Sequence, residues 1–299
     1  MCLLETIMRS HFSLAGSLAL AASLVMIVAP PLPAEMDKLT VDLWPTVQEM
    51  PQRPFMEIFR PFVPNDQLDA TVVILPGGGY GGLSPYDELY AEYFRSIGYT
   101  AVVVHYRYFP SQFPAPFADA ARAVRLIRKN GEKWGIPFDR IALMGASAGG
   151  HLAALLATRP FLYLAPDDDL VGEVSPRPDL LILAYPVISA VRPELLNSGS
   201  FARFLPQPAS HEQAEEVSPE LHVSERNPPT ILFHSADDAV VNVENSISFA
   251  RACWARQVPA ELHIFPSGGH GRSLSYSARW SPRWRRLTEV WLDDWLSRL

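Results

Sequence analysis

The sequence predicts an α/β protein with a mostly parallel central sheet and helices on both of its faces. From residue 71 onward, short runs of continuous apolar and β-branched residues alternate with longer stretches of helical spacing. Continuous apolar runs are typical of strands buried on both faces, and their alternation with helices is typical of parallel strands. The chain has 299 residues, 48% of them hydrophobic, which suffices for one sizeable core.

The predicted elements follow one another in order along the chain. Residues 35–54 are Pro-rich and weakly patterned, and we expect an extended lead-in there. Apolar runs predict strands at 71–75, 100–105, 140–144, 180–185, 230–234 and 261–265. Apolar residues at helical spacing predict helices at 86–97, 117–134, 151–157, 243–257 and 283–299. Together these elements form one expected domain, 35–299.

The segment 187–229 departs from this alternation. It is rich in Pro, Ser and Glu and has little sustained periodicity. Phe201, Phe204 and Leu205 give it apolar surface to bury, which favours an ordered insertion over a disordered surface loop. Inserted segments of this kind are often lids over a binding site, so we expect a cap here.

Residues 1–34 have the features of a secretory signal peptide. Arg9 precedes an apolar stretch, 12–29, which is followed by prolines and by small residues near Ala34. The stretch is short for a bilayer span, which needs about 20 apolar residues, and no cluster of Lys or Arg follows it. We therefore predict cleavage near Ala34 and a secreted or periplasmic protein without a stable membrane span. A retained N-terminal anchor is the alternative.

Charge and cysteine content argue against some classes of protein. The formal net charge is −7, from 25 Lys and Arg against 32 Asp and Glu. A mildly acidic surface argues against a nucleic-acid partner, which would call for a basic patch. Removal of residues 1–34 leaves Cys253 as the single cysteine, so we expect no internal disulfide. Its place beside Trp254 in a helical pattern predicts a buried structural thiol.

The pattern Gly-Ala-Ser-Ala-Gly at 145–149 carries a candidate nucleophile, Ser147. It follows the expected strand 140–144 and precedes the expected helix 151–157. A sharp strand-to-helix turn strains the serine backbone, exposes the hydroxyl above the sheet and tolerates only small neighbours. The helix N-terminus behind the serine favours developing negative charge. A tight glycine turn with an idle serine is the alternative.

A serine hydroxyl needs a base before it acts as a nucleophile at neutral pH. Among eight histidines, His270 lies in a glycine-rich loop directly after the last expected strand, 261–265. Hydrolases with this serine turn have the chain order Ser, acid, His, and His270 satisfies that order. The acid is then expected after strand 230–234, where Asp237 and Asp238 are adjacent. Either carboxylate could steady the imidazole, so physical reasoning leaves both open.

The tetrahedral intermediate of acyl transfer needs two backbone N–H donors for its oxyanion. One is expected from Ala148, directly after the nucleophile. The other is expected from Pro-Gly-Gly-Gly-Tyr-Gly-Gly at 76–82, because consecutive glycines let the backbone approach a substrate closely. A phosphate-binding loop is the alternative, but the run lacks a Gly-Lys-Ser/Thr ending and the spacing of a dinucleotide-binding fingerprint.

The sequence indicates neither a metal site nor a cofactor. His222 and His234 lack supporting ligands at the usual spacing. The acidic run 167–169 lacks the alternation and the later glutamate of an EF-hand loop, so we expect a solvated turn there. Side chains and backbone groups alone are therefore expected to carry the chemistry.

These motifs together resemble the acetyl-xylan and feruloyl esterase-like branch of the α/β-hydrolases. The resemblance covers about 71–295 and is carried by runs of residues in addition to the serine turn. These runs are Leu-Pro-Gly-Gly-Gly-Tyr at 75–80, Tyr-Arg at 106–107, Pro-Ala-Pro at 114–116, Asp-Ala-Ala-Arg at 119–122, Ser-Pro-Glu-Leu at 218–221, His-Ser-Ala-Asp-Asp-Ala-Val-Val at 234–241, Glu-Asn-Ser at 244–246 and Gly-Gly-His-Gly at 268–271. The resemblance implies an α/β-hydrolase fold, to which the composition of 187–229 adds an inserted lid-like segment.

The resemblance also assigns roles to single residues. It implies Ser147 as the nucleophile, Asp238 as the acid and His270 as the base. Three residues are implied to surround the oxyanion: Gly78, Gly79 and Ala148. The chain departs from the family pattern at two positions of the acid loop where proline is frequent, Ala239 and Asn242, so the shape of that loop is left open.

We expect a serine carboxylester hydrolase for short acyl groups, and the resemblance suggests acetyl esters on xylan or another plant polysaccharide. Export fits, because polymers must be met outside the cytoplasm. Family members are often named xylanases, but nothing here resembles the paired carboxylates of a glycosidase. Two alternatives remain open: an exported serine peptidase or amidase with the same three residues, and a non-catalytic carbohydrate-binding protein, which would leave those residues unexplained.

Overall fold

The computed structural model describes residues 38–44, 52–63, 68–166, 168–170, 173–271 and 281–297. All of them belong to one structural unit, Pro33–Leu299. The predicted signal peptide lies outside the described residues. Within the described ranges, no helix combines the length and the apolar character needed to cross a bilayer.

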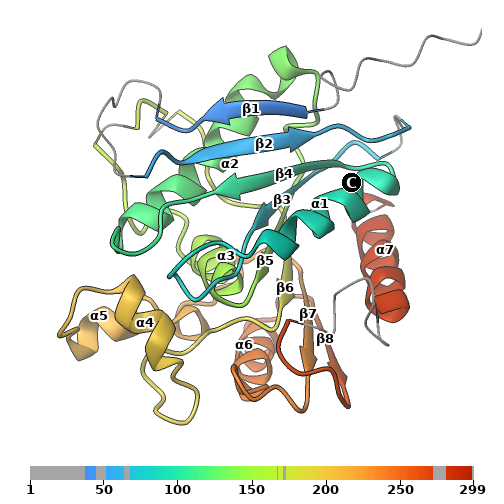
Figure 1. Ribbon diagram of the computed structural model, residues 1–299. Coiled ribbons are helices and arrows are strands. Elements are labelled where there is room, and N and C mark those ends of the chain that lie inside the picture. The colour runs from blue at the N-terminus through green and yellow to red at the C-terminus, as the bar shows by residue number, and fades with distance from the viewer. Residues whose placement is uncertain are drawn as a thin grey trace, which may run out of the picture. The chain divides into compact units, whose positions relative to one another are not determined.

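An eight-stranded sheet forms the centre of this unit, in the order β1-β2-β4-β3-β5-β6-β7-β8 (Figure 1). β1 (Lys38–Asp42) and β2 (Phe55–Phe59) run antiparallel to their neighbours, and all later pairs are parallel. The parallel strands are β3 (Thr71–Leu75), β4 (Thr100–His105), β5 (Ile141–Ala146), β6 (Leu180–Ala184), β7 (Thr230–Ser235) and β8 (Ala260–Phe265). The prediction of a mostly parallel sheet is confirmed.

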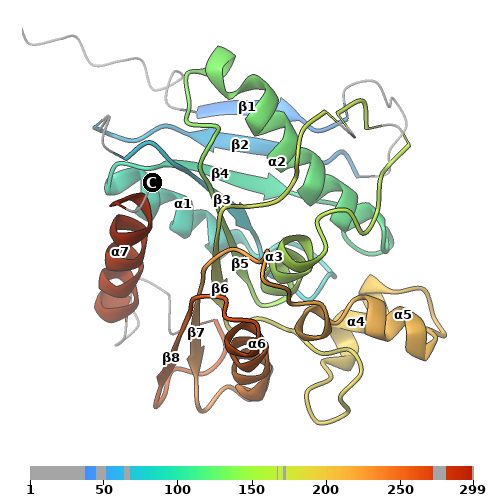
Figure 2. The same ribbon diagram turned by 180° about the vertical axis from the view of Figure 1, so that it is seen from behind.

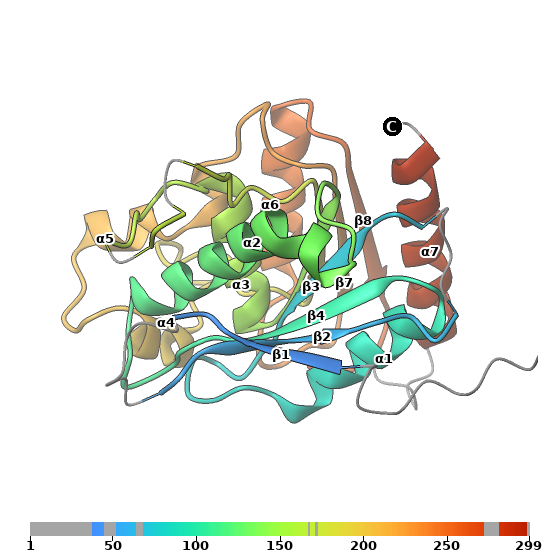
Figure 3. The ribbon, with the colours of Figure 1, turned by 90° about the horizontal axis from the view of Figure 1, so that it is seen from above.

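Helices cover both faces of the sheet, as predicted. α1 (Glu88–Ser96) and α7 (Ser281–Ser297) pack on one face, where the 3-10 helix η2 (Pro85–Asp87) precedes α1. The helices of the other face are α2 (Ala115–Trp134), α3 (Ala148–Thr158) and α6 (Glu244–Ala255). Figures 1 and 2 view the sheet from its two sides, and Figure 3 shows α1 and α2 on opposite sides of β2 and β4.

The two helical layers enclose two apolar clusters, which the strands separate. Successive side chains of a strand point to opposite faces of the sheet. In β3, Val72 and Ile74 therefore join the cluster under α1 and α7, while Val73 and Leu75 join the cluster under α2, α3 and α6. Because both faces are covered, every residue of β3 is buried, which explains why its sequence is continuously apolar.

The expected insertion, 187–229, contains short helices. They are α4 (Ser198–Phe204), α5 (His211–Glu216) and the 3-10 helix η3 (Pro219–Leu221); α4 and α5 lie side by side in Figures 1 and 2. Ser210 and Gln213 form a capping box that starts α5. The three apolar residues expected to anchor the segment are buried: Phe201, Phe204 and Leu205.

Two expectations about the chain are wrong. Residues 38–42 form β1 instead of an extended lead-in, and β2 follows at 55–59. β1 is an edge strand whose residues alternate between exposed and half-buried, so it lacks the continuous apolar run that marks the inner parallel strands β3 to β7. The helix after Ser147 also begins earlier than expected, at Ala148, because the serine itself is its N-cap residue.

The acidic run 167–169 is not a solvated turn at its centre. The side chain of Asp168 is fully buried and contacts the Nη1 atoms of Arg122 and Arg125, each at 2.6 Å. Both guanidinium groups come from α2, more than 40 residues earlier, so the local sequence carries no sign of this pairing. The prediction of a buried thiol at Cys253 is confirmed.

Candidate active site

Loops that follow the carboxyl ends of four parallel strands meet at one edge of the sheet. They follow β3, β5, β7 and β8 and carry, in that order, the glycine run 76–82, Ser147, Asp238 and His270. Ligands of parallel α/β sheets bind at this edge, because all strands deliver their following loops to it.

Ser147 occupies the strained strand-to-helix turn that the sequence predicts. Its backbone has φ 54° and ψ −118°, a conformation that side chains other than glycine rarely adopt. The turn is held in place because the Ser147 N–H donates to the Ala184 carbonyl at 2.9 Å and its own carbonyl accepts from the Val187 N–H at 3.1 Å. A side chain on Gly149 would place its Cβ 2.1 Å from the Leu75 carbonyl oxygen, so only glycine allows this close approach.

His270 lies between the predicted nucleophile and one of the two candidate acids. Its Nε2 is 2.9 Å from the Ser147 Oγ, and its Nδ1 is 2.8 Å from the Asp238 Oδ2. A carboxylate can only accept, so Nδ1–H donates to it, which leaves Nε2 free to accept from the serine hydroxyl. The edge of Tyr185 packs against the imidazole with ring centroids 4.8 Å apart. This geometry is that of a serine hydroxyl poised against a general base.

The structure separates the two adjacent carboxylates that the sequence could not. Asp238 has a fully buried side chain and reaches the imidazole of His270. Asp237 is exposed and accepts instead from the Gly269 N–H at 2.8 Å, in the loop that carries His270. The loop geometry therefore brings Asp238, and not Asp237, to the His270 imidazole.

Hydrogen bonds keep Asp238 ionised despite its burial. Burial alone raises the pKa of a carboxyl group, but donors surrounding Asp238 outweigh it and hold its pKa well below the ordinary value. These donors are His234, His270 and the backbone N–H of Val241, and the charge of His270 adds to them. A second backbone N–H, that of Val240, donates at 2.9 Å. Asp238 is thus expected to carry a negative charge at neutral pH beside the His270 imidazole.

The glycine run 76–82 forms a turn that requires glycine. Gly78 and Gly79 have φ of 125° and 60°, and a Cβ on Gly78 would lie 2.2 Å from the Gly82 carbonyl oxygen. The turn is closed by the Gly81 N–H, which donates to the Gly78 carbonyl at 3.1 Å. A Cβ added at Gly77 would lie 3.3 Å from the Ser147 Cβ, so the run packs directly against the nucleophile.

The three residues predicted to surround the oxyanion all have available donors. Within the described ranges, no acceptor is paired with the backbone N–H of Gly78, Gly79 or Ala148. Ala148 is the first residue of α3, where helix N–H groups lack an intrahelical partner. The arrangement suits the developing charge of a tetrahedral intermediate next to Ser147.

A buried histidine, His151, which local sequence patterns do not mark as functional, links the glycine run to the insertion. The Nε2 of His151 is 2.7 Å from the Val217 carbonyl oxygen, and its Nδ1 is 2.6 Å from the Tyr80 hydroxyl. A carbonyl only accepts, so Nε2–H donates to Val217 and Nδ1 accepts from Tyr80. Burial lowers the pKa of His151 to about 4, which keeps the ring neutral in this role.

A second residue missed in the sequence is Asp87, which ends η2. Its carboxylate is buried and accepts from the Gly77 N–H at 2.5 Å and from the Ser84 hydroxyl at 3.4 Å. Burial raises the pKa of Asp87 to about 6. Nothing in the local sequence marks it, because its partners are set by the turn of the glycine run.

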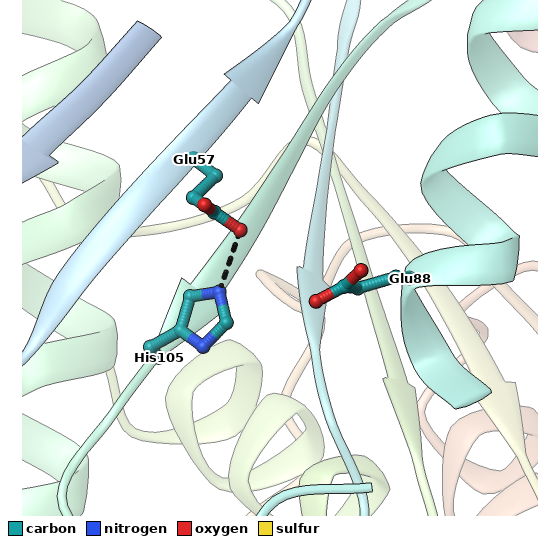
Figure 4. Close-up of side chains that lie close together, drawn as sticks. All are labelled: Glu57, Glu88 and His105. Atoms are coloured by element: carbon teal, nitrogen blue, oxygen red, sulfur yellow. Dashed lines mark hydrogen bonds and ion pairs between the residues drawn. The ribbon is translucent and has the colours of Figure 1, made fainter. Parts of the chain in front are cut away.

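Three possible metal ligands gather elsewhere among the described residues: Glu57, Glu88 and His105 (Figure 4). Glu57 already contacts the Lys38 ammonium at 2.6 Å and the His105 Nε2 at 3.0 Å. An ammonium this near the carboxylate would repel a metal ion, so we assign no metal to the group.

Comparison with known proteins agrees with the geometry. Residues 56–162 match the BD-FAE family and residues 182–298 match the prolyl oligopeptidase family. The crystal structure of an acetyl ester-xyloside bifunctional hydrolase from Caldicellulosiruptor lactoaceticus is similar, with a TM-score of 0.78 and 36% identity over 86% of this chain and 96% of that one.

Two curated relatives share the sequence over most of this chain. Endo-1,4-beta-xylanase B of Butyrivibrio fibrisolvens is 34% identical over 68% of this chain and 32% of its own length. The acetylxylan esterase of Xylanibacter ruminicola is 29% identical over 70% of this chain and 42% of its own length. The chain therefore spans less than half the length of these relatives.

Proposed function

We propose that this chain, which belongs to the acetyl-xylan and feruloyl esterase-like α/β-hydrolases, is a serine carboxylester hydrolase for short acyl esters. The observation that carries the proposal is the continuous hydrogen-bonded path from Asp238 through His270 to Ser147. Free N–H groups of the glycine run and of α3 next to that path complete what acyl transfer needs.

In the proposed mechanism, the Ser147 Oγ attacks the ester carbonyl while the His270 Nε2 takes its proton. The carbonyl oxygen becomes an oxyanion that accepts from Ala148 and from Gly78 or Gly79. His270 then protonates the leaving alcohol, and an acyl-enzyme on Ser147 results. Water attacks the acyl carbonyl with His270 again as base, which releases the acid and restores the serine. Asp238 stabilises the imidazolium that forms in each half of the cycle.

Acetylated xylan is the substrate that the relatives suggest. One relative is named as an acetylxylan esterase, and the similar crystal structure is named as an acetyl ester-xyloside hydrolase. We propose acetyl groups on xylan or a related polysaccharide as the natural ester. The segment 187–229 is proposed to form a cap, because α4 carries Phe204 against the Tyr80 ring of the glycine run, with ring centroids 4.5 Å apart.

Export completes the proposal. The predicted signal peptide, 1–34, would deliver the domain to the periplasm or the medium, where a polymeric substrate is found. Antibody detection of the tagged protein in cell fractions tests this. The tag must be recovered outside the cytoplasm, without residues 1–34, for the assignment to stand.

Hydrolysis of nitrophenyl acetate, butyrate and octanoate by wild type and Ser147→Ala tests the activity. We expect a preference for acetate, release of acetic acid from acetylated xylan, and loss of nearly all activity in the variant. Equal rates for the variant and the wild type would contradict the mechanism. A preference for octanoate would contradict the short-acyl assignment.

A peptidase is the second candidate, because residues 182–298 match the prolyl oligopeptidase family. That range contains Asp238 and His270 but not Ser147. An esterase would use the same acid and base, so the match does not by itself favour a peptidase. Dipeptidyl nitroanilides distinguish the two activities. Turnover of these amides at a kcat/KM above that for nitrophenyl acetate would favour the peptidase.

A further inference from the structure

The buried carboxylate of Asp87 takes no part in the acyl transfer described above. The residue is 4% exposed and closes η2, directly before α1. It accepts the Gly77 N–H at 2.5 Å, a short charge-assisted hydrogen bond. The Ser84 hydroxyl donates to the same carboxylate more weakly, at 3.4 Å.

Gly77 contacts both the Asp87 carboxylate and the turn that carries Ser147. Its carbonyl accepts from the Ser84 N–H at 3.0 Å, so the run is tied to η2 on both sides of this residue. Its Cα packs against the nucleophile turn, since an added Cβ would lie 3.0 Å from the Ala146 carbonyl oxygen. The next two residues, Gly78 and Gly79, carry the free N–H groups. A shift of the Gly77 backbone therefore moves both donors relative to Ser147.

We propose that Asp87 is a positioning residue for ester hydrolysis: its ionised carboxylate holds the Gly77 N–H and so fixes the oxyanion donors relative to the nucleophile. The proposal rests on the proposed esterase function and extends it to a residue that touches neither substrate nor base. Oxyanion stabilisation depends on donors that are already in place when charge develops, which is why a fixed backbone matters here.

The surroundings of Asp87 make the strength of its hydrogen bond with the Gly77 N–H depend on pH. Four titratable groups from other elements or from α1 interact electrostatically with it: Tyr90 of α1, Tyr106 after β4, Tyr185 after β6 and His270 after β8. Burial raises the pKa of Asp87 to about 6, against the lowering effects of Gly77, Ser84 and His270. The carboxylate therefore takes up a proton just below neutrality.

Protonation of Asp87 weakens catalysis in two ways. A neutral carboxyl accepts the Gly77 N–H less strongly than a carboxylate does, so the glycine run loses part of its restraint. The loss of a nearby negative charge also disfavours the imidazolium that His270 forms in the transition state. Below about pH 6 we therefore expect protonation of Asp87 to reduce activity.

The test compares Asp87→Asn with wild type, with Glu88→Gln as the matched control that removes the next, exposed carboxylate. We measure kcat and KM for nitrophenyl acetate between pH 5 and pH 9. For Asp87→Asn we expect kcat about 10-fold lower at pH 8 with KM nearly unchanged. Its kcat should fall less steeply at low pH than that of wild type and Glu88→Gln, because the variant lacks the Asp87 protonation. The proposal is overturned if the pH profile of kcat in Asp87→Asn equals that of wild type. It is also overturned if kcat is lower but falls as steeply at low pH as in wild type.

Ser84→Ala provides a test that keeps the Asp87 carboxylate. Removal of the hydroxyl raises the pKa of Asp87 further, because that hydrogen bond lowers it. The steep part of the pH profile should therefore move to higher pH. An unmoved profile would contradict the proposal even if Asp87→Asn failed to fold.

An NMR titration of the Gly77 amide separates this proposal from the proposed function. It is recorded on Ser147→Ala, so it needs no activity. We expect the Gly77 amide proton to move upfield as the pH falls through about 6, because its acceptor loses charge. A Gly77 amide that does not titrate would refute the Asp87 assignment whether or not the protein is an esterase. Absence of ester hydrolysis together with this titration would refute the function alone.

Discussion

Two buried carboxylates act on the His270 imidazole, and their environments differ. Asp238, after β7, accepts two backbone N–H groups and lies within 3.3 Å of two imidazole nitrogens. Asp87, after η2, accepts one N–H and a distant hydroxyl. Burial raises the pKa of each, but only Asp238 has enough donors to reverse the effect. Asp87 is the more deeply buried residue and has fewer donors, so burial and hydrogen bonding together set the direction of each shift.

This difference divides the site into a constant part and an adjustable part. The acid loop stays charged over the whole range in which an esterase works, so it holds His270 in one tautomer throughout. The glycine run depends on a carboxylate that titrates within that range. If the proposed function holds, we expect activity to fall at mildly acidic pH with a contribution from the oxyanion side of the site.

The largest expected effect comes from Asp238→Asn. An amide carries no charge to stabilise the imidazolium and favours the wrong tautomer, so we expect kcat to fall by about 10⁴-fold. It also leaves several buried donors facing a poorer acceptor, which lowers the free energy of unfolding by about 3 kcal/mol. Nitrophenyl acetate turnover and urea unfolding measure both. A loss of kcat below 10-fold would show that Asp238 is not the acid.

Asp87→Asn should raise the free energy of unfolding at neutral pH, whereas Asp238→Asn should lower it. The native state binds the Asp87 proton more tightly than the unfolded chain, so this group's stabilisation is complete below pH 4 and is lost as the pH rises through about 6. The difference between 3.8 and about 6 corresponds to about 3 kcal/mol. Relative to wild type, the variant should gain about this much between pH 4 and pH 8. Unfolding in urea at the two pH values measures it, and a flat difference would refute the raised pKa.

Tyr80→Phe tests the other anchor of the glycine run, with a smaller expected effect. The His151 Nδ1 would lose its donor while buried, which costs about 1–2 kcal/mol of unfolding free energy. We expect kcat to fall about fivefold, because a second restraint on the oxyanion donors is loosened. Tyr108→Phe is the control, since among the described residues its hydroxyl makes no hydrogen bond. Equal melting temperatures and equal kcat in Tyr80→Phe and Tyr108→Phe would show that the Tyr80 hydroxyl does not restrain the glycine run.

The smallest effect is expected from Asp237→Asn. Its carboxylate is exposed and holds one N–H of the His270 loop, and an amide oxygen can accept the same bond. We expect kcat to fall by about threefold or less. A loss near that of Asp238→Asn would transfer the role of the acid to the neighbouring residue.

The sequence predicts the parts of the fold that are buried on both sides. All six parallel strands are found where the sequence predicts them. β3 to β7 are continuously apolar or nearly so because both of their faces are covered. β8 is an edge strand that contains Glu261 and His263. The edge strand β1 is not predicted, because its side chains alternate between exposed and half-buried. Local patterning therefore identifies the inner parallel strands, and alternation with predicted helices identifies β8, but neither signal marks β1 or β2.

The same limit applies to the site. The strand-to-helix turn and chain order identify Ser147 and His270, because both are properties of the sequence itself. Asp238 and Asp237 are separated only by where the loop points each side chain. Asp87 and Asp168 are missed because each is defined by partners distant in the chain or by a turn that the sequence does not specify.

Labelling with a fluorophosphonate, followed by peptide mass spectrometry, tests the central claim most directly. A serine activated by His270 attacks the phosphorus atom, displaces fluoride and keeps the phosphonyl group. We predict one modified residue, Ser147, and labelling that is slowed by about 10³-fold or more in His270→Ala. Modification of another residue, or labelling of Ser147 at the wild-type rate in His270→Ala, would contradict the account.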